Sequence, residues 1–231
     1  MFVTNHAALK IGKCLVISDL HMGAEYDILK SGIRVRQVED LIERTMDLLK
    51  LTGARDLILL GDVKHNVPFS RRVEEISVPL YLEAVSRKAH VTIIPGNHDG
   101  SIAELCPHRV DISETPGILV GKYGLMHGHT KIPKNLEKAS FLVIGHNHPM
   151  FMFEDDGGGR FYRQVWVRGR MHDGRELIVM PAFSRLVGGM ALNNKKGDFS
   201  LMGPVARHMD MKSSMLYLLD GTLLGKLGDI K

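Results

Sequence analysis

Five apolar segments of this sequence end in polar side chains that can bind metal ions or transfer protons. These side chains are Asp19 and His21, Asp62, Asn97 with His98 and Asp99, His127, and His146 with His148. Carboxylate and imidazole groups together suit first-row divalent ions. An apolar strand that stops and presents polar side chains is how open α/β sheets form sites, at the carboxyl ends of their strands. If the strands lie in one sheet, the five loops converge on one rim.

The set of polar groups is larger than one tetrahedral ion needs. Two carboxylates, one amide oxygen and several imidazoles fit two ions that share a bridging carboxylate, about 3.5–4 Å apart, as in phosphoryl chemistry. The mixture of nitrogen and oxygen ligands without a thiolate favours Mn, Fe or Zn over a soft metal. The same mixture argues against a structural zinc site.

The elements that must position these groups are short buried strands and covering helices. Apolar runs predict strands over residues 13–17, 56–60, 91–94, 123–126 and 141–144, the fourth forming a hairpin with 118–120. Apolar residues at helical spacing predict a helix over 33–51, with Gly53 at its C-cap. A second helix is expected over about 71–87, with a break or a late start caused by Pro79.

Beyond residue 150 the pattern changes from α/β to mostly β. Candidate strands cover 151–153, 161–167 and 177–180, and a final hairpin turns at Asp220-Gly221. There are no internal repeats and no long linker. We therefore expect a single domain over residues 1–231, with the motifs in 18–148 and residues 150–231 completing a second sheet.

Composition limits the alternatives further. The chain is 44% hydrophobic and carries a net charge of +4, which permits a phosphate-bearing partner without demanding one. No apolar run is long enough to cross a bilayer and the N-terminus lacks a signal-peptide pattern, so we expect no membrane association and a cytoplasmic location. Cys14 and Cys106 lack metal-ligand spacing and are expected to be buried, reduced thiols.

The motif order Asp-x-His, Gly-Asp, Gly-Asn-His-Asp, His-Gly and Gly-His-x-His resembles the calcineurin-like metallophosphoesterase family over residues 18–148. The resemblance implies a four-layer α/β/β/α sandwich, in which two mixed sheets are flanked by helices. It implies two divalent metal ions, with Mn²⁺ favoured and Fe, Zn or Ni as alternatives, and a hydroxide between them as nucleophile. The ligands it implies are Asp19, His21 and His148 for the first ion, Asp62 as the bridge, and Asn97, His127 and His146 for the second.

Three further residues acquire expected roles from the resemblance. His98 would face the leaving-group oxygen as a proton donor or transition-state stabiliser, and Asp99 would orient its ring; the alternative for His98 is a packing or capping histidine. His129 is a candidate substrate contact, a hydrogen-bond partner behind the ligands, or the ligand itself in place of His127. We favour His127 as the ligand because it directly follows the strand.

The motifs of this sequence differ from those of the protein phosphatases of the family, and the differences bear on which substrate is expected. The arginine that clamps a phosphomonoester dianion after the Gly-Asp motif is missing. His65, three residues after Asp62, looks instead like the nuclease and phosphodiesterase branches, where it sits near the scissile phosphate; alternatively it is a solvent-facing loop residue. The Asp-Leu-His-x-Gly and Gly-Asp-x-Lys-His motifs, with residues 180–189, look like a subgroup of predicted phosphoesterases found in archaea and, in bacteria, beside DNA ligase and helicase genes.

The expected function is hydrolysis of phosphodiester bonds in nucleotides or nucleic acid by a dinuclear metal-dependent enzyme. The alternatives are a phosphomonoesterase or nucleotidase acting on small phosphates, and a non-catalytic scaffold on the same fold. The partner is a phosphate-ester substrate, and the oligomeric state stays open, with a homo-oligomer among the alternatives. Basic residues that could touch phosphate are Lys64, Arg71, Arg72, Lys131, Lys134 and Arg185. Aromatic residues near them are sparse, so no base-stacking platform is expected.

Overall fold

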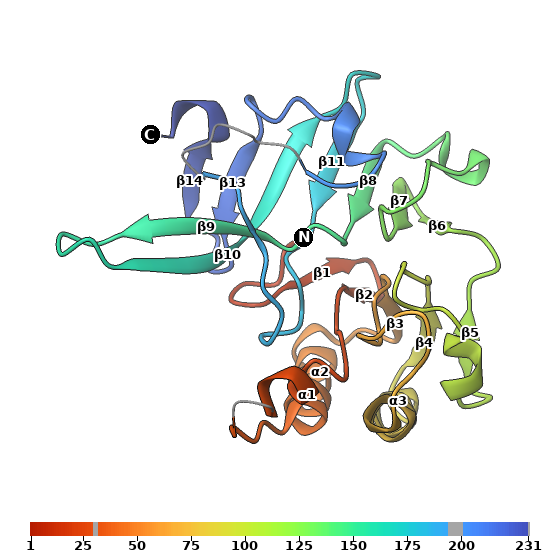
Figure 1. The fold of residues 1–231 in the computed structure, drawn as a ribbon. Coiled ribbons are helices and arrows are strands. Elements are labelled where there is room, and N and C mark those ends of the chain that lie inside the picture. The colour runs from red at the N-terminus through yellow and green to blue at the C-terminus, as the bar shows by residue number, and fades with distance from the viewer. Residues whose placement is uncertain (30–31, 194–200, 231) are drawn as a thin grey trace.

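A computed structural model describes residues 1–29, 32–193 and 201–230 of the chain. Two β-sheets pack face to face, and the α-helices lie on the outer side of the first sheet (Figure 1). The predicted α/β architecture with two mixed sheets is confirmed.

The first sheet contains five strands in the order β1-β2-β3-β4-β5. Strands β2 to β5 are parallel, and β1 runs antiparallel to β2. Helices α2 and α3 provide the connections between parallel neighbours and cover the outer face (Figure 1). The elements of this half are β1 (Ala8–Ile11), β2 (Cys14–Ile17), α1 (Glu25–Leu29), α2 (Gln37–Thr52), β3 (Asp56–Leu59), α3 (Arg72–Ser86), β4 (His90–Ile93), the 3₁₀ helix η1 (Ile102–Leu105) and β5 (Val110–Ile112).

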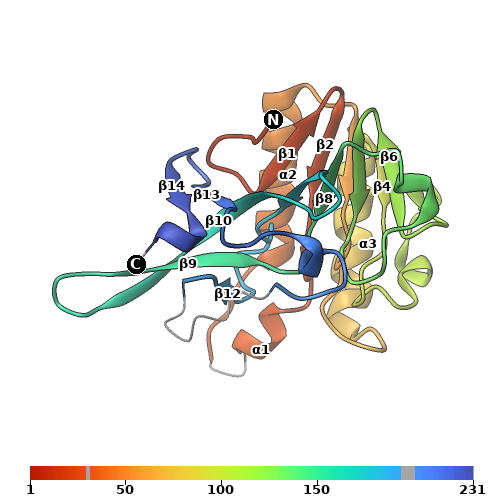
Figure 2. The same ribbon diagram turned by 90° about the horizontal axis from the view of Figure 1, so that it is seen from above.

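In the described part of the chain, the second sheet contains nine strands. Its main order is β12-β9-β10-β11-β8-β7-β6, and β13 and β14 extend it from β10. The hairpin of β9 and β10 reaches beyond the rest of the molecule (Figures 1 and 2). The strands are β6 (Gly117–Val120), β7 (Tyr123–Met126), β8 (Phe141–Ile144), β9 (Pro149–Glu154), β10 (Arg160–Arg170), β11 (Glu176–Val179), β12 (Met190–Ala191), β13 (Met215–Leu218) and β14 (Leu223–Lys226); the 3₁₀ helices are η2 (Lys134–Leu136), η3 (Ala206–His208) and η4 (Leu227–Asp229).

Three apolar layers hold these elements together. One lies between the first sheet and its helices and includes Leu57, Tyr81 and Leu48. A second lies between the two sheets and includes the fully buried Trp166. The third covers the outer face of the second sheet, and it is closed in the described residues by 3₁₀ helices and loops, with Leu136 of η2 as an example. Because alternate side chains of a strand point to opposite faces, each central strand contributes to two of these layers.

The predicted elements agree with the observed ones with a few differences. The helix over 33–51 is α2, and Gly53 caps it in the left-handed conformation with φ of 60°. Helix α3 continues through Pro79 without the expected break. The proline removes the hydrogen bond to the Glu75 carbonyl, and Glu75 is exposed, so water can replace that bond. Strands β1, β5 and β12 are additional to the predicted set.

No helix in the described parts of the chain is both long and apolar enough to span a membrane.

Candidate metal centre

The polar residues predicted to act together do meet, although their strands lie in two sheets rather than in one. Strands β2, β3 and β4 of the first sheet lead to Asp19, Asp62 and His98. Strands β7 and β8 of the second sheet lead to His127 and His146. The candidate site therefore lies at the edge shared by the two sheets, where all five strands end.

The first group of candidate ligands consists of Asp19, His21 and His148. Their ligand atoms all lie within 4.8 Å of one another. His148 Nε2 is 3.1 Å from Asp19 Oδ1 and 3.2 Å from His21 Nε2. Three ligand atoms thus point to one small volume, which matches the set expected for the first ion.

The second group consists of Asp62, His127 and His146, again with ligand atoms within 4.8 Å of one another. Asp62 Oδ2 lies 3.3 Å from His127 Nε2 and 3.6 Å from His21 Nε2 of the first group. The Asp62 carboxylate is therefore located between the two groups, as expected of a bridge. Asn97 lines the same trough as Asp62 and His146.

The backbone of these candidate ligands is unusual. Asp19, His21, Asp62, His146 and His148 all have positive φ, between 43° and 68°. Non-glycine residues rarely adopt this region, at a cost of roughly 1–3 kcal/mol each, and such strain clusters at functional sites. In the described residues only two other non-glycine positions share it.

Glycines beside the candidate ligands allow this close packing. A Cβ atom on Gly61 would collide with the His127 ring, and one on Gly96 would collide with the Asp62 carboxylate. At Gly145 a Cβ atom would collide with Ser18 and lie 2.6 Å from Asp19 Oδ2. The Gly-Asp, Gly-Asn-His-Asp and Gly-His-x-His motifs thus need glycine because no room is left for a side chain at these positions.

Backbone carbonyls set the orientation of the imidazole rings. His127 Nδ1 lies 2.9 Å from the Leu60 carbonyl, and His148 Nδ1 lies 3.1 Å from the Gly188 carbonyl. Because each Nδ1 donates its proton to a carbonyl, the neutral ring presents an unprotonated Nε2 to the site. This tautomer is the one that binds a metal ion through Nε2.

The site fits metal ions on electrostatic grounds as well. Asp19 and Asp62 are buried, and in the described residues no lysine or arginine lies within ion-pair distance of either carboxylate. Among the described residues, the buried His127 Nε2 has no hydrogen-bond partner, since its approach to Asp62 lacks hydrogen-bond geometry. Buried carboxylates without a lysine or arginine counter-ion and an unpartnered ring nitrogen are the groups that a cation would satisfy.

Without metal, a proton on His127 offsets part of the negative charge of these carboxylates. Burial alone lowers the pKa of His127, but the Asp62 and Asp19 carboxylates outweigh it and raise that pKa to about 9. Burial also lowers the pKa of His148, while the hydrogen bond and charge of Asp19 raise it above its ordinary value overall. Burial lowers the pKa of His21 to about 3 and, with the charge of His127, that of His146 to about 4. At neutral pH, His127 is therefore charged, and the His21 and His146 rings are neutral.

We predict that metal affinity rises with pH between about pH 7 and pH 9. A metal ligand must be unprotonated, so uptake at neutral pH displaces the proton that His127 holds up to its pKa of about 9. One displaced proton corresponds to roughly a tenfold gain in affinity per pH unit below that pKa. Chelator competition at several pH values measures the slope, with His129→Gln as the neighbouring control. An affinity independent of pH over this range would contradict the assigned protonation.

His98 lies beside both groups rather than within them. Its backbone N–H donates to Asp62 Oδ1 at 2.9 Å, and its Nδ1 forms a short hydrogen bond to the His65 carbonyl. Its Nε2, 3.9 Å from Asp62 Oδ2, is directed at the trough. The ring can therefore present a proton on Nε2 to a bound substrate while Nδ1 stays fixed.

Asp99 makes different contacts from those expected. Its carboxylate accepts hydrogen bonds from the backbone N–H groups of Val63, Lys64 and Gly96, at 2.8, 3.2 and 2.8 Å. The His98 ring is oriented by the His65 carbonyl instead. Asp99 thus joins the loop after Asp62 to the turn before His98, and it supports both loops rather than the ring.

His65 contacts the outer side of a candidate ligand. Its Nδ1 lies 3.3 Å from His21 Nδ1, and its Nε2 lies 3.7 Å from Asp27 Oδ2. If His21 uses Nε2 as a ligand, its Nδ1 proton points to His65, and His65 then carries its own proton toward Asp27. His21, His65 and His98 also form a third group with ligand atoms within 4.8 Å. His65 therefore faces the site, and its expected catalytic role stays a prediction.

His129 lies behind the candidate ligands. Its ring centroid is 5.3 Å from that of His127 and 6.2 Å from that of His146. It does not line the trough, whereas His146 does. Its buried Nδ1 has no hydrogen-bond partner in the described residues. The substrate-binding role expected of His129 stays a prediction, and the observed position is closer to a support behind the ligands.

Two supporting residues were not found from the sequence. Glu74 is fully buried, and its carboxylate accepts from the backbone N–H groups of His65, Asn66 and Arg71. Gln37 donates to the His21 carbonyl at 3.0 Å and contacts the same loop from α2. For Glu74 the available signal was its position three residues after the start of a helix, typical of a capping box.

An open trough of about 730 Å³ runs past both groups and includes His21, Asp62, Asn97, His98, His146 and His148. A smaller hollow of about 360 Å³ continues it past His65 and Val187. Neither lining contains a lysine or an arginine among the described residues. Fold and site together define a class: an α/β sandwich with candidate metal ligands gathered where the strands of two sheets end.

Comparisons with known proteins identify the family. A model described as calcineurin-like phosphoesterase matches residues 12–178. The chain is 30% identical over 112 residues to Phosphodiesterase YfcE of Escherichia coli (strain K12), covering 46% of this chain and 61% of that relative. The crystal structure of the nuclease MPE of Pseudomonas putida shares the fold, with a TM-score of 0.57 at 21% identity, covering 90% of this chain and 85% of that one. The chain belongs to the calcineurin-like phosphoesterase family.

Proposed function

We propose that this protein is a dinuclear metal-dependent phosphodiesterase acting on nucleotides or nucleic acid. The observation that carries the proposal is the position of Asp62 between two groups of candidate ligands. Family membership supports phosphoester chemistry, and a relative that covers part of the chain is named a phosphodiesterase. The chain matches 61% of that relative's length, so activity and substrate are proposals here.

The proposed mechanism assigns distinct tasks to the residues of the trough. Asp19, His21 and His148 would hold one ion, Asn97, His127 and His146 the other, and Asp62 both. Two divalent ions, with Mn²⁺ favoured, would supply Lewis acidity and a water of lowered pKa. His98 gives the Nε2 proton to the leaving oxygen, while the His65 carbonyl holds Nδ1 and fixes the orientation of the ring.

The trough favours a diester over a monoester. A phosphomonoester is a dianion at neutral pH, and proteins usually clamp it with arginine. No arginine or lysine among the described residues lines the trough or the adjoining hollow. A diester carries one negative charge and leaves less charge to neutralise. This difference favours the phosphodiesterase over the phosphomonoesterase alternative.

Substrate preference tests the proposal directly. With added Mn²⁺, kcat/KM for bis-p-nitrophenyl phosphate should exceed that for p-nitrophenyl phosphate by roughly tenfold or more, because a missing charge-assisted hydrogen bond costs about 1.5–3 kcal/mol. Metal analysis of the purified protein accompanies the assay. Turnover of the monoester alone would overturn the diesterase assignment. A protein that binds no metal and hydrolyses neither ester would instead be the scaffold.

A further inference from the structure

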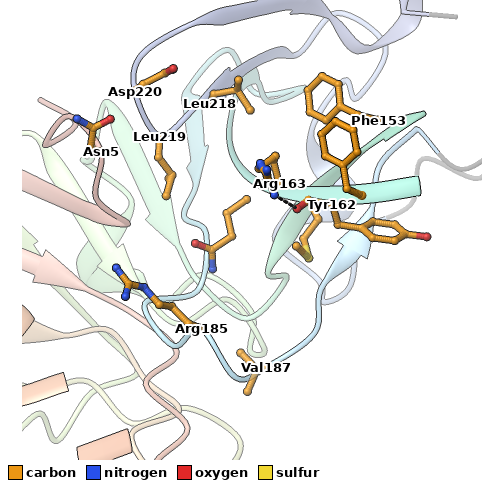
Figure 3. A pocket seen from close by; sticks show the side chains of 12 residues that line it. Asn5, Phe153, Tyr162, Arg163, Arg185, Val187, Leu218, Leu219 and Asp220 are labelled. Atoms are coloured by element: carbon orange, nitrogen blue, oxygen red, sulfur yellow. Dashed lines mark hydrogen bonds between the residues drawn. The ribbon is translucent and has the colours of Figure 1, made fainter. Parts of the chain in front are cut away.

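A second cavity, of about 700 Å³, is lined by residues of β9 and β10 and of neighbouring loops (Figure 3). We call it the arm groove. Tyr162 and Arg163 reach it from β10, Phe153 from β9, Arg185 and Val187 from the loop after β11, and Leu219 from the segment after β13.

The arm groove is continuous with the trough. Val187 lines both the arm groove and the hollow beside His65. Met150, which lines the arm groove, follows the candidate ligand His148 by two residues and packs against Gly189, which lines the trough. A chain held at the metal centre can therefore extend along β9 into the arm groove.

The arm groove displays aromatic rings. Phe161 and Tyr162 are 41% and 47% exposed. Antiparallel pairing of β9 and β10 sets Phe161 opposite Phe153, and the two rings stack with centroids 5.3 Å apart. No aromatic platform was expected from the sequence. Phe161 and Tyr162 follow one another on β10, so their rings lie on opposite faces of the strand. The Phe161 ring is covered by Phe153 and Arg163, whereas the Tyr162 ring is exposed, and an exposed ring of this kind stacks on unpaired nucleobases.

Cationic groups accompany the rings. The Arg163 guanidinium lies 5.1 Å from the Phe161 centroid, and in the described residues no carboxylate lies within ion-pair distance of it. Arg185 is 67% exposed, with its closest carboxylate, that of Asp40, at 3.4 Å. Among the described residues, Asp220 contributes the single carboxylate of the lining, which leaves a net charge of +1. Exposed arginines beside aromatic rings suit a ligand in which phosphates alternate with flat bases.

We propose that the arm groove binds the single-stranded polynucleotide segment that flanks the phosphodiester at the metal centre. A base stacks on Tyr162, and the backbone phosphates pair with Arg163 and Arg185. A duplex presents stacked, inaccessible bases and gains only the phosphate contacts. The link to the reaction rests on the proposed function, whereas binding by the arm groove is separable from it.

Binding of a labelled oligothymidylate of about twelve nucleotides tests the proposal. The metal-loaded His98→Asn protein, in which turnover is expected to be slow, is used throughout. Adding Tyr162→Ser or Arg163→Glu should raise Kd by roughly tenfold or more. Arg163→Glu should also reduce the dependence of log Kd on log salt concentration. Arg170→Glu, the same charge change at the other end of β10, is the matched control and should leave Kd within about twofold.

Three outcomes would overturn the proposal: no binding of the oligonucleotide, equal Kd values for the groove variants and the Arg170→Glu control, or equally tight binding of inorganic polyphosphate or of a duplex. Turnover of bis-p-nitrophenyl phosphate by the wild-type protein is measured in parallel. If bis-p-nitrophenyl phosphate is hydrolysed but the oligonucleotide does not bind, the arm groove proposal is overturned and the proposed function is kept. If the oligonucleotide binds and the groove variants weaken that binding, but neither ester is hydrolysed, the proposed function is overturned and the arm groove proposal is kept.

Discussion

Asp62→Asn is expected to lower turnover of phosphodiesters by about 10³-fold or more and to remove at least one metal equivalent. Asparagine has the shape of aspartate and can still accept the His98 backbone N–H at Oδ1. It lacks the negative charge that lies between the two groups of candidate ligands, 3.6 Å from His21 Nε2 and 3.3 Å from His127 Nε2. Metal content by mass spectrometry and kcat/KM for bis-p-nitrophenyl phosphate are the measurements.

Asp56→Asn is the matched control for this variant. Asp56 begins β3, the same strand that leads to Asp62, but it lies at the opposite edge of the sheet and its side chain is 42% exposed. The control should keep both metal equivalents and wild-type turnover. An Asp62→Asn protein with unchanged metal content and turnover would show that the bridging assignment is incorrect.

His98→Ala is expected to keep both metal ions and to lower kcat by roughly 10²–10⁴-fold, the usual range for a positioned acid or base. The His98 ring lies 4.9 Å from the His21 ring, and its Nε2 lies 3.9 Å from Asp62 Oδ2, but His98 belongs to neither group of candidate ligands. His98→Asn can retain a donor toward the His65 carbonyl while lacking the imidazole proton. The two variants together separate orientation of the loop from proton transfer.

Comparing substrates with different leaving groups tests proton donation by His98 most directly. A p-nitrophenolate leaves without help from an acid, whereas a less acidic phenol needs a proton. The loss on His98→Ala should therefore be larger for phenyl than for p-nitrophenyl diesters. His90→Ala, at the exposed start of the strand that leads to His98, is the control. Equal losses for both esters, or loss of one metal equivalent, would contradict proton donation by His98.

The sequence was sufficient to predict which residues form the candidate site and how they are grouped. Asp19, His21 and His148 meet as expected, and so do Asp62, His127 and His146. Each follows an apolar strand, and strands of an α/β fold deliver their following residues to a common edge. The contacts that orient these groups were not predictable. The Leu60 and Gly188 carbonyls that hold the His127 and His148 rings carry no signature in the sequence, since every residue has a carbonyl.

The fold was predictable where local pattern decides structure. Buried strands are recognised in the sequence as apolar runs. Helix α2 is recognised by apolar residues at helical spacing and by the glycine after its last turn. The helix break predicted at Pro79 was wrong. Whether a proline breaks a helix depends on whether the carbonyl that loses its hydrogen bond, here that of Glu75, can reach water, and the tertiary structure decides this. The assignment of the whole chain to one domain stays a prediction.

By itself, the sequence determined which side chains are available and which strands carry them to an edge, because burial of apolar strands and turns at glycine are local consequences of composition. Only the tertiary structure decided that the strand ends come from two facing sheets. It also decided that Asp99 supports loops rather than the His98 ring, and that Phe161, Tyr162 and Arg163 form a groove continuous with the metal trough. These relations join residues distant in the chain, and their geometry depends on how the two sheets pack.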